Sequence, residues 1–431
     1  MTPPFSPNLK LVPERFRDTD AERGTIDVPA RHEAPGKHAI TLSFVRLPHR
    51  GDGPGTPLVF LSGGPGLSGI RSASGRLFPL FDSLRDHGDV ILLDQRACVV
   101  AGMVPKADDA PPGSRTREEW LEIIARTVSR DIAALANLGI PVAAMDSNQS
   151  ADDVALIART LYGSNVRIAL LGWSYGSHLA MAIMKRHEAM LSRVVLAAPE
   201  GPDHTLKRPL RVQEHLERLG QRARKDVIGM LSRALDRSEN RFELQWIISE
   251  LAADTRALRK LPMWLERMEG GDFQVIRDEP LLRGAWDALH DELPHSAVRY
   301  AFDCASGAMA SRHALIQREA CETLLGNTID FPLPEICEAL GCPDLGDEFR
   351  AAPKSNVPVM FITGTLDCRT PPQNVEDLSP GLPDHRHLIV RDAGHGDLLL
   401  PSGVHAAIHR FIGGGEPGQL EVAVDTPFAF E

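Results

Sequence analysis

The sequence lacks the features of a membrane protein or a nucleic-acid binder. In its 431 residues no apolar run approaches the roughly 20 residues that a membrane-spanning helix needs. Lys and Arg number 47 against 58 Asp and Glu, a net charge of −11, whereas nucleic acids and anionic membrane surfaces are bound through a basic footprint. The N-terminus has no charged stretch followed by an apolar segment, so we expect no signal peptide. Membrane and nucleic-acid partners are therefore not expected.

Cysteine is scarce, and its spacing does not suit a metal site. The six cysteines stand at positions 98, 304, 321, 337, 342 and 368, with no Cys-x-x-Cys and no Cys/His ligand spacing. The sequence also lacks a His-Glu-x-x-His motif and a glycine-rich phosphate loop followed by Lys-Ser/Thr. We therefore expect no metal and no cofactor. A reduced, cytoplasmic chain is the simplest interpretation, and a disulfide between Cys337 and Cys342 is the alternative.

Short apolar runs alternating with helical patterns predict an α/β fold. Apolar residues make up 43% of the chain, enough for a sizeable core. Nearly continuous apolar runs occur at 58–61, 90–93, 168–171, 194–198, 359–363 and 387–390. Strands buried on both faces have this composition, and helical patterns at 120–138, 150–161 and 176–187 separate several of them. These units predict a mostly parallel, doubly wound sheet, preceded by two extended segments at 24–29 and 38–47.

The strand pattern stops between about residues 203 and 345. Leu-, Arg- and Glu-rich helical stretches fill this part, including 212–219, 226–235 and 244–251. We interpret it as a helical insertion after the sixth strand, which divides the chain into 1–202, 203–345 and 346–431. Ser150 followed by Asp153 is a weak helix-start signal, because Asp replaces the usual Glu of a capping box.

The strongest chemical signal is Gly-Trp-Ser-Tyr-Gly at residues 172–176. An apolar strand leads into it and a helical pattern follows it, which is the setting of a nucleophile elbow around Ser174. Glycines suit a turn too tight for flanking side chains. A serine hydroxyl needs a base, and elbows of this kind are followed in sequence by an acid and then a histidine. Asp367 and His395 follow in that order, each on a loop after a predicted strand.

Two further features complete the predicted site. The sequence Ser-Gly-Gly-Pro-Gly at 62–66 directly follows a strand, so the N–H groups of Gly63 and Gly64, with that of Tyr175, are predicted to form an oxyanion hole. Glu200, after the strand ending at 198, is a rival to Asp367 as the acid of the triad.

These motifs together resemble the proline iminopeptidase and tripeptidyl aminopeptidase group of α/β-hydrolases. The matching segments are 62–66, Asp-Gln-Arg at 94–96, 172–176, 364–367 and 393–395, with Gly-Thr-Ile-Asp-Val-Pro at 24–29 resembling the tripeptidyl branch. The resemblance implies an α/β-hydrolase fold with a helical cap over the active site, where acidic side chains bind the free amino group of a peptide. Glu200, Glu214 and Glu217 are the candidates for that role, and Trp173 is a further candidate substrate contact.

The chain departs from the family pattern at two places. Ser62 stands where the family usually has histidine, and residues 97–100, Ala-Cys-Val-Val, replace the usual Gly-x-Gly-x-Ser. Apolar residues beside the oxyanion loop predict a more apolar pocket. Cys98 and Cys368 lie near the predicted site in sequence, and we expect both to be packing residues.

The leading hypothesis is a serine hydrolase that cleaves an amide or ester through an acyl-enzyme, with an aminopeptidase as the choice that the resemblance implies. The alternative is an esterase or amidase for a small acyl substrate, including a natural product. A third hypothesis is a non-catalytic binding protein with the same fold. The first two predict a small-molecule or short-peptide substrate and no resident cofactor.

Overall fold

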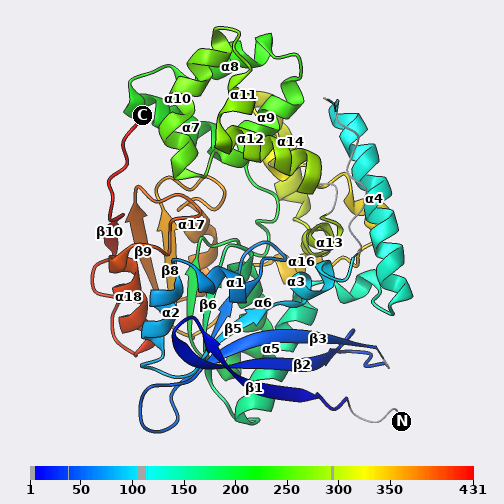
Figure 1. Cartoon of the computed structure of the whole chain (residues 1–431), viewed down its shortest axis with the longest axis vertical. Coiled ribbons are helices and arrows are strands. Elements are labelled where there is room, and N and C mark those ends of the chain that lie inside the picture. Colours follow the sequence, from blue (N-terminus) through cyan, green and yellow to red (C-terminus); the bar gives the residue numbers. More distant parts are fainter. Residues whose placement is uncertain (1–4, 37, 105–112, 114, 293–295) are drawn as a thin grey trace.

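A ten-stranded sheet organises the computed structural model, which describes residues 5–36, 38–104, 113, 115–292 and 296–431 (Figure 1). The strands are β1 (Leu9–Phe16), β2 (Thr19–Pro29), β3 (Ala39–Leu47), β4 (Leu58–Leu61), β5 (Val90–Asp94), β6 (Ile168–Trp173), β7 (Leu191–Ala197), β8 (Val359–Gly364), β9 (His385–Arg391) and β10 (Glu421–Ala423). They lie in the order β1-β2-β3-β5-β4-β6-β7-β8-β9-β10. The pairs from β1 to β5 are antiparallel, and all pairs from β5 to β10 are parallel. The predicted, mostly parallel sheet is confirmed.

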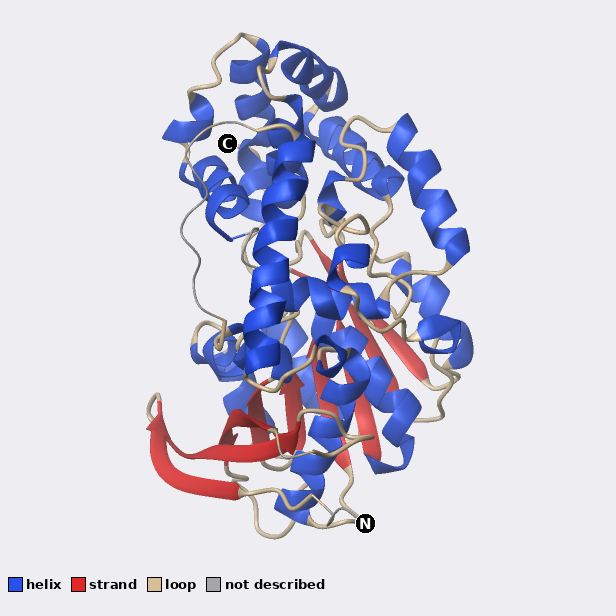
Figure 2. Ribbon diagram, turned by 90° about the vertical axis from the view of Figure 1, so that its right-hand side faces the viewer, coloured by secondary structure: helices blue, strands red, loops and turns tan. Residues whose placement is uncertain are grey.

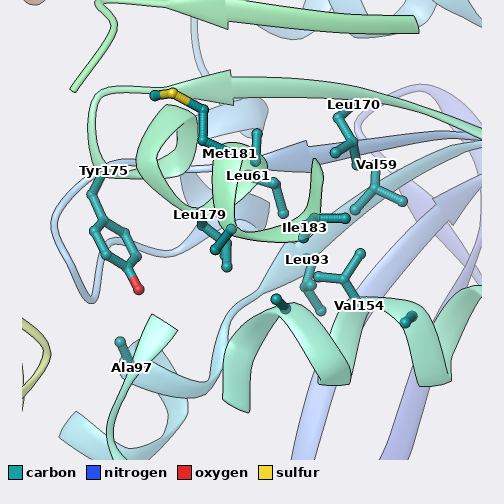
Figure 3. Packing of buried hydrophobic residues seen from close by; sticks show 14 of the residues in the cluster. Val59, Leu61, Leu93, Ala97, Val154, Leu170, Tyr175, Leu179, Met181 and Ile183 are labelled. Atoms are coloured by element: carbon teal, nitrogen blue, oxygen red, sulfur yellow. The ribbon is translucent and has the colours of Figure 1, made fainter. Parts of the chain in front are cut away.

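Helices cover both faces of the sheet. They include α1 (Gly69–Ser74), α2 (Phe78–Leu84), α3 (Arg96–Ala101), α5 (Ser147–Tyr162), α6 (Tyr175–His187), α17 (Asn374–Leu378) and α18 (Ser402–Ile412). Successive side chains of a strand point to opposite faces, and in β4 Val59 and Leu61 pack into the cluster that contains α5 and α6 (Figure 3). Leu58 and Phe60 pack into the cluster with α2 and α18 on the other face. Burial on both faces explains why these strands are continuous apolar runs.

A long helical segment separates β7 from β8, although these two strands are neighbours and pair in parallel. It contains α7 (Pro209–Ala223), α8 (Val227–Arg237), α9 (Arg241–Leu251), α10 (Thr255–Glu269), α11 (Val275–Asp278), α12 (Pro280–Asp287), α13 (Ala297–Ser306), α14 (Ala310–Glu322), α15 (Cys337–Leu340) and α16 (Gly346–Arg350). Helices α7 to α12 gather at one end of the molecule, away from β1 to β3 (Figures 1 and 2). Their apolar side chains form a separate core around Trp264. The boundaries of this segment as a domain remain a prediction.

The helix α4 (Arg117–Asn137) belongs to both cores. Trp120, Ile124 and Val128 in its N-terminal part pack into the helical core, whereas Leu135 near its end packs into the sheet core. The amphipathic pattern at 120–138 is the same along the helix. Which core each turn meets was therefore decided by the tertiary structure.

Several predicted details are wrong. The sequence analysis missed β1 and β10. Because β1 is the first strand, the strand that the prediction counts as the sixth is β7. β1 contains Pro13, which has no N–H to donate, and it lies at the edge of the sheet with mostly unburied side chains. The predicted capping box is also wrong, because α5 begins at Ser147 and is capped by the side chain of Asp146, which accepts from the N–H of Gln149.

The cysteine predictions are wrong as well, because the structure contains a disulfide where a reduced chain was expected, and the pair differs from the alternative Cys337–Cys342. Cys337 forms a disulfide with Cys304, across a Cα–Cα distance of 5.2 Å, and not with Cys342, whose thiol is free. The bridge links α13 to α15 through two cysteines that are 33 residues apart in sequence. Periodicity and spacing could not identify this pair, because the contact between the two helices is tertiary.

Candidate active site

Ser174 lies at a sharp turn between β6 and α6. Its φ of 56° is in the left-handed region that side chains rarely adopt. The two flanking glycines have a steric cause. A Cβ on Gly172 would lie 2.3 Å from the carbonyl oxygen of Gly176, and a Cβ on Gly176 would lie 1.9 Å from that of Leu61. The backbone therefore closes so tightly around the turn that no side chain fits at position 172 or 176.

The structure brings Ser174, Asp367 and His395 together from three separate loops. Nε2 of His395 lies 3.0 Å from Oγ of Ser174, and Nδ1 lies 2.8 Å from Oδ2 of Asp367. An ionised carboxylate only accepts hydrogen bonds, so Nδ1 carries the proton. Nε2 is then free to accept the proton of the serine hydroxyl. This is the hydrogen-bond chain that serine activation requires.

The side chain of Asp367 is fully buried, yet its carboxyl group stays ionised. Burial by itself raises its pKa, but the charge and hydrogen bond of His395, together with hydrogen bonds from Thr370, lower the pKa to about 2. Oδ1 accepts the backbone N–H groups of Arg369 at 2.9 Å and Thr370 at 3.0 Å, and Oδ2 accepts the Thr370 hydroxyl at 2.7 Å. The loop after β8 therefore fixes the carboxylate before any substrate binds.

The helical segment holds the loop that carries His395. The backbone N–H of His395 donates to the carbonyl oxygen of Ala253, just before α10, at 3.0 Å. On the other side, Nε1 of Trp173 donates to the His395 carbonyl oxygen at 3.3 Å. The imidazole is thus positioned by residues of both the sheet and the helical segment.

The loop at 62–66 lies directly against the serine. A Cβ on Gly63 would lie 3.2 Å from Cβ of Ser174, and Gly64 has a φ of 121°, which favours glycine. Ser62 donates its hydroxyl to the carbonyl oxygen of Leu67, and Nε2 of Gln95 donates to the Ser62 carbonyl at 2.9 Å. Ser62 therefore braces this loop. Tyr175 is the first residue of α6, and the first N–H groups of a helix have no acceptor within it.

The residues at 97–100 form α3 beside this loop. Ala97 is fully buried, and a Cβ on Gly66 would lie 3.8 Å from its carbonyl oxygen. Burial raises the pKa of the Cys98 thiol to about 11 and that of Cys368 to about 12, so both thiols are neutral at pH 7. Cys368 donates to the carbonyl oxygen of Ala252.

Two cavities meet at Ser174. The outer cavity is lined by the glycine loop, Trp173, His395 and the apolar residues Leu67, Ala97, Ala101 and Val298. The inner cavity shares Gly64, Ser174 and the charged residues Glu250, Arg299 and Arg369 with it, and is strongly charged. Its acidic residues are Glu200, Glu250, Asp303 and Asp330, and its basic residues are Lys207, Arg299 and Arg369. The outer cavity is therefore largely apolar and the inner one polar.

The carboxylates of the inner cavity differ in how well their charge is compensated. Burial raises the pKa of Glu200, but Lys207, 3.2 Å away, outweighs it and the pKa is lowered. Burial raises the pKa of Asp303 to about 7, although Arg299 lies 3.7 Å away. Burial likewise raises the pKa of Asp330 to about 7, against the effect of Lys207. Asp303 and Asp330 are thus the poorly compensated acids beside the serine.

The C-terminal part of the chain carries the family signature. Residues 332–421, which include Asp367 and His395, match the model of the family described as TAP-like protein. This C-terminal segment of the chain is therefore similar to the TAP-like family of α/β-hydrolases. The predicted family resemblance and the predicted α/β-hydrolase fold are confirmed.

Several solved structures are distantly similar to this chain. A thermophilic esterase from Thermogutta terrifontis is 16% identical with a TM-score of 0.39, covering 90% of this chain and 98% of the esterase. A putative non-heme bromoperoxidase, BpoC from Mycobacterium tuberculosis H37Rv, is 16% identical with a TM-score of 0.43, covering 88% and 99%. No curated protein matches the sequence.

Among the described residues, no helix is both long and apolar enough to cross a bilayer. In the same part of the chain, no group of three or more His, Cys, Asp or Glu residues is arranged to hold a metal ion.

The predicted substrate-binding residues have mixed outcomes. Trp173 lines the outer cavity and Glu200 the inner one. Glu200 pairs with Lys207, whereas Asp367 is the carboxylate that accepts the hydrogen bond from His395. Glu214 pairs with Arg211 at 3.1 Å, and Glu217 accepts from Gln213 at 3.4 Å. Neither is among the described residues that line the two cavities.

The sequence analysis missed the charged residues that do line the inner cavity. Asp303 lies on α13, Asp330 precedes the Pro-rich stretch at 332–334, and Glu250 lies in the last turn of α9. All three are in the helical segment, where acidic residues are frequent on solvated helix faces. No local signal separated these three from the others.

Proposed function

We propose that the chain is a serine hydrolase that works through an acyl-enzyme. The carrying observation is the continuous hydrogen-bond chain from Ser174 through His395 to Asp367, at 3.0 and 2.8 Å. The positive φ of Ser174 supports the same proposal, because strained residues of this kind cluster at active sites.

In the first step Oγ of Ser174 bonds to the acyl carbon of an amide or ester, and its proton passes to Nε2 of His395. The bond to the leaving amine or alcohol then breaks, and the leaving group takes that proton. Water completes the cycle. It gives a proton to Nε2 while its oxygen bonds to the acyl carbon, and Ser174 leaves with the proton. Asp367 stabilises the imidazolium that forms twice.

The charge on the attacked oxygen needs donors of its own. We assign the oxyanion hole to the backbone N–H groups of Gly64 and Tyr175, with Gly63 shaping the approach to Ser174. Such donors contribute about 10²–10³ in rate each. The residue types fit, because the glycine loop has no side chain to block the site and Tyr175 begins a helix.

Within this class we propose an aminopeptidase that releases N-terminal residues. Asp303 and Asp330 support it, because both are buried, face the cavity of Ser174 and have a pKa raised to about 7. A substrate ammonium group placed beside them would stabilise their ionised forms. The helical segment then acts as a cap that supplies the amine-binding residues.

The apolar wall of the outer cavity favours a second candidate, an esterase or amidase for a small acyl substrate. Leu67, Ala97, Ala101 and Val298 offer no group that would recognise an amine or a peptide bond. In that case the acyl or alcohol part of the substrate occupies this wall.

Covalent labelling tests the serine hydrolase. A fluorophosphonate should label the wild-type protein and not Ser174→Ala, and His395→Ala should lose turnover to nearly the same residual rate, because triad members act as a unit. A folded wild-type protein that never labels would leave the third hypothesis, a non-catalytic binding protein.

A substrate panel separates the two enzymes. Aminoacyl p-nitroanilides with a free α-amine are compared with their N-acetyl forms and with simple p-nitrophenyl esters. The aminopeptidase requires the free amine, and Asp303→Asn should raise KM for these substrates alone. Equal rates with and without the amine would favour the esterase.

A further inference from the structure

A third cavity, which we call the cationic cavity, adjoins the inner cavity. The two share Lys207 and Arg369, and the inner cavity shares Ser174 with the outer one. The basic residues of the cationic cavity are Lys207, Arg208, Arg211, Arg312 and Arg369. The inner and cationic cavities are therefore neighbours, and Lys207 and Arg369 lie at their boundary.

The charge of the cationic cavity is opposite to that of the whole chain. Its lining has five Lys and Arg residues against two acids, Glu376 and Asp377, whereas the chain has a net charge of −11. An excess of cations in a partly enclosed cavity creates a positive potential there, and low-dielectric walls focus this field. Such a cavity favours an anionic group.

Most of these cations already have a carboxylate partner, but Arg312 does not. Arg208 pairs with Glu319, and Arg369 pairs with Glu250 at 3.0 Å. The half-buried Arg312, in the first turn of α14, donates Nε to the carbonyl oxygen of Leu206 at 2.8 Å. Among the described residues it forms no ion pair within 4 Å, although the charges of Asp203, Asp330 and Asp377 act on it from farther away.

Other polar groups that line the inner and cationic cavities also lack hydrogen-bond partners. The Oγ1 atom of Thr205, a residue only 4% exposed, has no hydrogen-bond partner among the described residues and lines the inner cavity next to Lys207. Oε1 of Gln373 is likewise unpaired and lines the cationic cavity. A hydroxyl can donate a hydrogen bond to an anion. An amide side chain can do so when its oxygen and its NH2 group exchange places. Unpaired buried polar atoms indicate that a ligand completes these contacts.

We propose that the cationic cavity binds a carboxylate of the substrate whose scissile bond lies at Ser174. The inference rests on the proposed serine hydrolase. It adds a specificity determinant, because the preferred substrate carries an anionic group several atoms from the attacked carbonyl, with Arg312 as its principal partner and Arg211 as a second one. Lys207 and Arg369 lie at the boundary between the inner and cationic cavities.

Covalent probes test this without knowledge of the natural substrate. Alkyl fluorophosphonates of increasing chain length are prepared in two forms, one ending in a carboxylate and the other in its methyl ester. Ser174 Oγ bonds to phosphorus, fluoride leaves, and His395 takes the proton in both cases. The ratio of the two labelling rates at each length therefore reports only the recognition of the distant charge.

At one range of chain lengths we expect the carboxylate probe to label about tenfold faster than its ester, as one charge-assisted hydrogen bond provides. Arg312→Gln should bring the ratio of the two labelling rates close to one. Arg211→Gln provides a second variant should Arg312→Gln fail to fold. Arg126→Gln, at an exposed arginine of α4 that pairs with Glu122 at 3.8 Å, is the matched control and should keep the full ratio.

The possible outcomes are distinct. Ester probes that label Ser174 while the acid probes gain no advantage at any length would overturn the carboxylate site and leave the serine hydrolase intact. If neither form labels Ser174, both the carboxylate site and the proposed serine hydrolase are wrong. Free glutarate and inorganic phosphate form a separate arm. The result to look for is a change in the rate of labelling by the ester probe in the wild type but not in Arg312→Gln. If these anions cause it while the acid probe labels no faster than its ester, the cavity binds a free anion and the substrate proposal is wrong.

Discussion

Replacing Asp367 by asparagine tests the role of the hydrogen-bond chain with almost no change in shape. The carboxylate accepts four hydrogen bonds, two on each oxygen. If the asparagine keeps its oxygen toward the backbone N–H groups of Arg369 and Thr370, its NH2 group faces Nδ1 of His395. Nδ1 must then accept, so the imidazole proton moves to Nε2. An Nε2 that donates to Ser174 cannot take the serine proton.

We therefore expect Asp367→Asn to lower kcat by about three to four orders of magnitude with little change in KM. Its stability effect follows from the pKa of Asp367, which is lowered from 3.8 to about 2 and corresponds to about 2 kcal/mol. Because the pKa is lowered, this stabilisation is present above pH 4 and disappears as the pH falls toward 2. The variant should thus be about 2 kcal/mol less stable at pH 7 and match the wild type near pH 2.

The assay combines initial rates on a chromogenic substrate with denaturant unfolding at several pH values. Asp392→Asn is the matched control, since Asp392 is three residues from His395 but pairs with Arg222 at 2.6 Å. It should keep turnover within a few-fold. An Asp367→Asn enzyme that retains turnover near the wild-type rate would refute the proposed role, and a loss equal to that in Asp392→Asn would show that the effect is not specific.

Three further outcomes follow from particular contacts. Gly176→Ala places a Cβ 1.9 Å from the carbonyl oxygen of Leu61, so both the melting temperature and turnover should fall, and an unchanged melting temperature would contradict the closed elbow. Arg96→Met leaves the buried carboxylate of Asp153 without its bidentate partner and should cost about 3–5 kcal/mol in denaturant unfolding, against little change if the pair is dispensable. The raised pKa of Asp303 favours its protonated form in the fold, so its contribution to stability is lost as pH rises from about 4 through 7. Asp303→Asn should therefore gain stability over the wild type at pH 8 but not at pH 4, and the same shift at both values would show that ionisation is not the cause.

The central strands could be predicted because each is buried on both faces. β4 was predicted with its exact bounds, since all four of its residues lie in one apolar run. The edge strands β1 and β10 could not be, because a strand with one neighbour and a solvated face has no such composition. The helices of the segment between β7 and β8 were visible as amphipathic stretches, but the elements against which they pack were not.

The candidate triad could be located for a related reason. Ser174, Asp367 and His395 each follow a strand within a few residues, and the carboxyl ends of parallel strands meet at one edge of the sheet. The acids of the inner cavity could not be located, because Asp303 and Asp330 are single polar residues in a helical segment with many others. Glu214 and Glu217 were chosen from the same segment, and both contact neighbours on their own helix.

By itself the sequence determined the α/β order, the elbow around Ser174 and the likeness to TAP-like hydrolases, because these depend on patterns that are local along the chain. Only the tertiary structure decided that Cys304 pairs with Cys337, that the helical segment holds the His395 loop through Ala253, and that Arg312 lines a cavity next to the one at the serine. Those features depend on which surfaces of separate helices come into contact, and the periodicity of a helix defines its apolar face without defining the partner of that face.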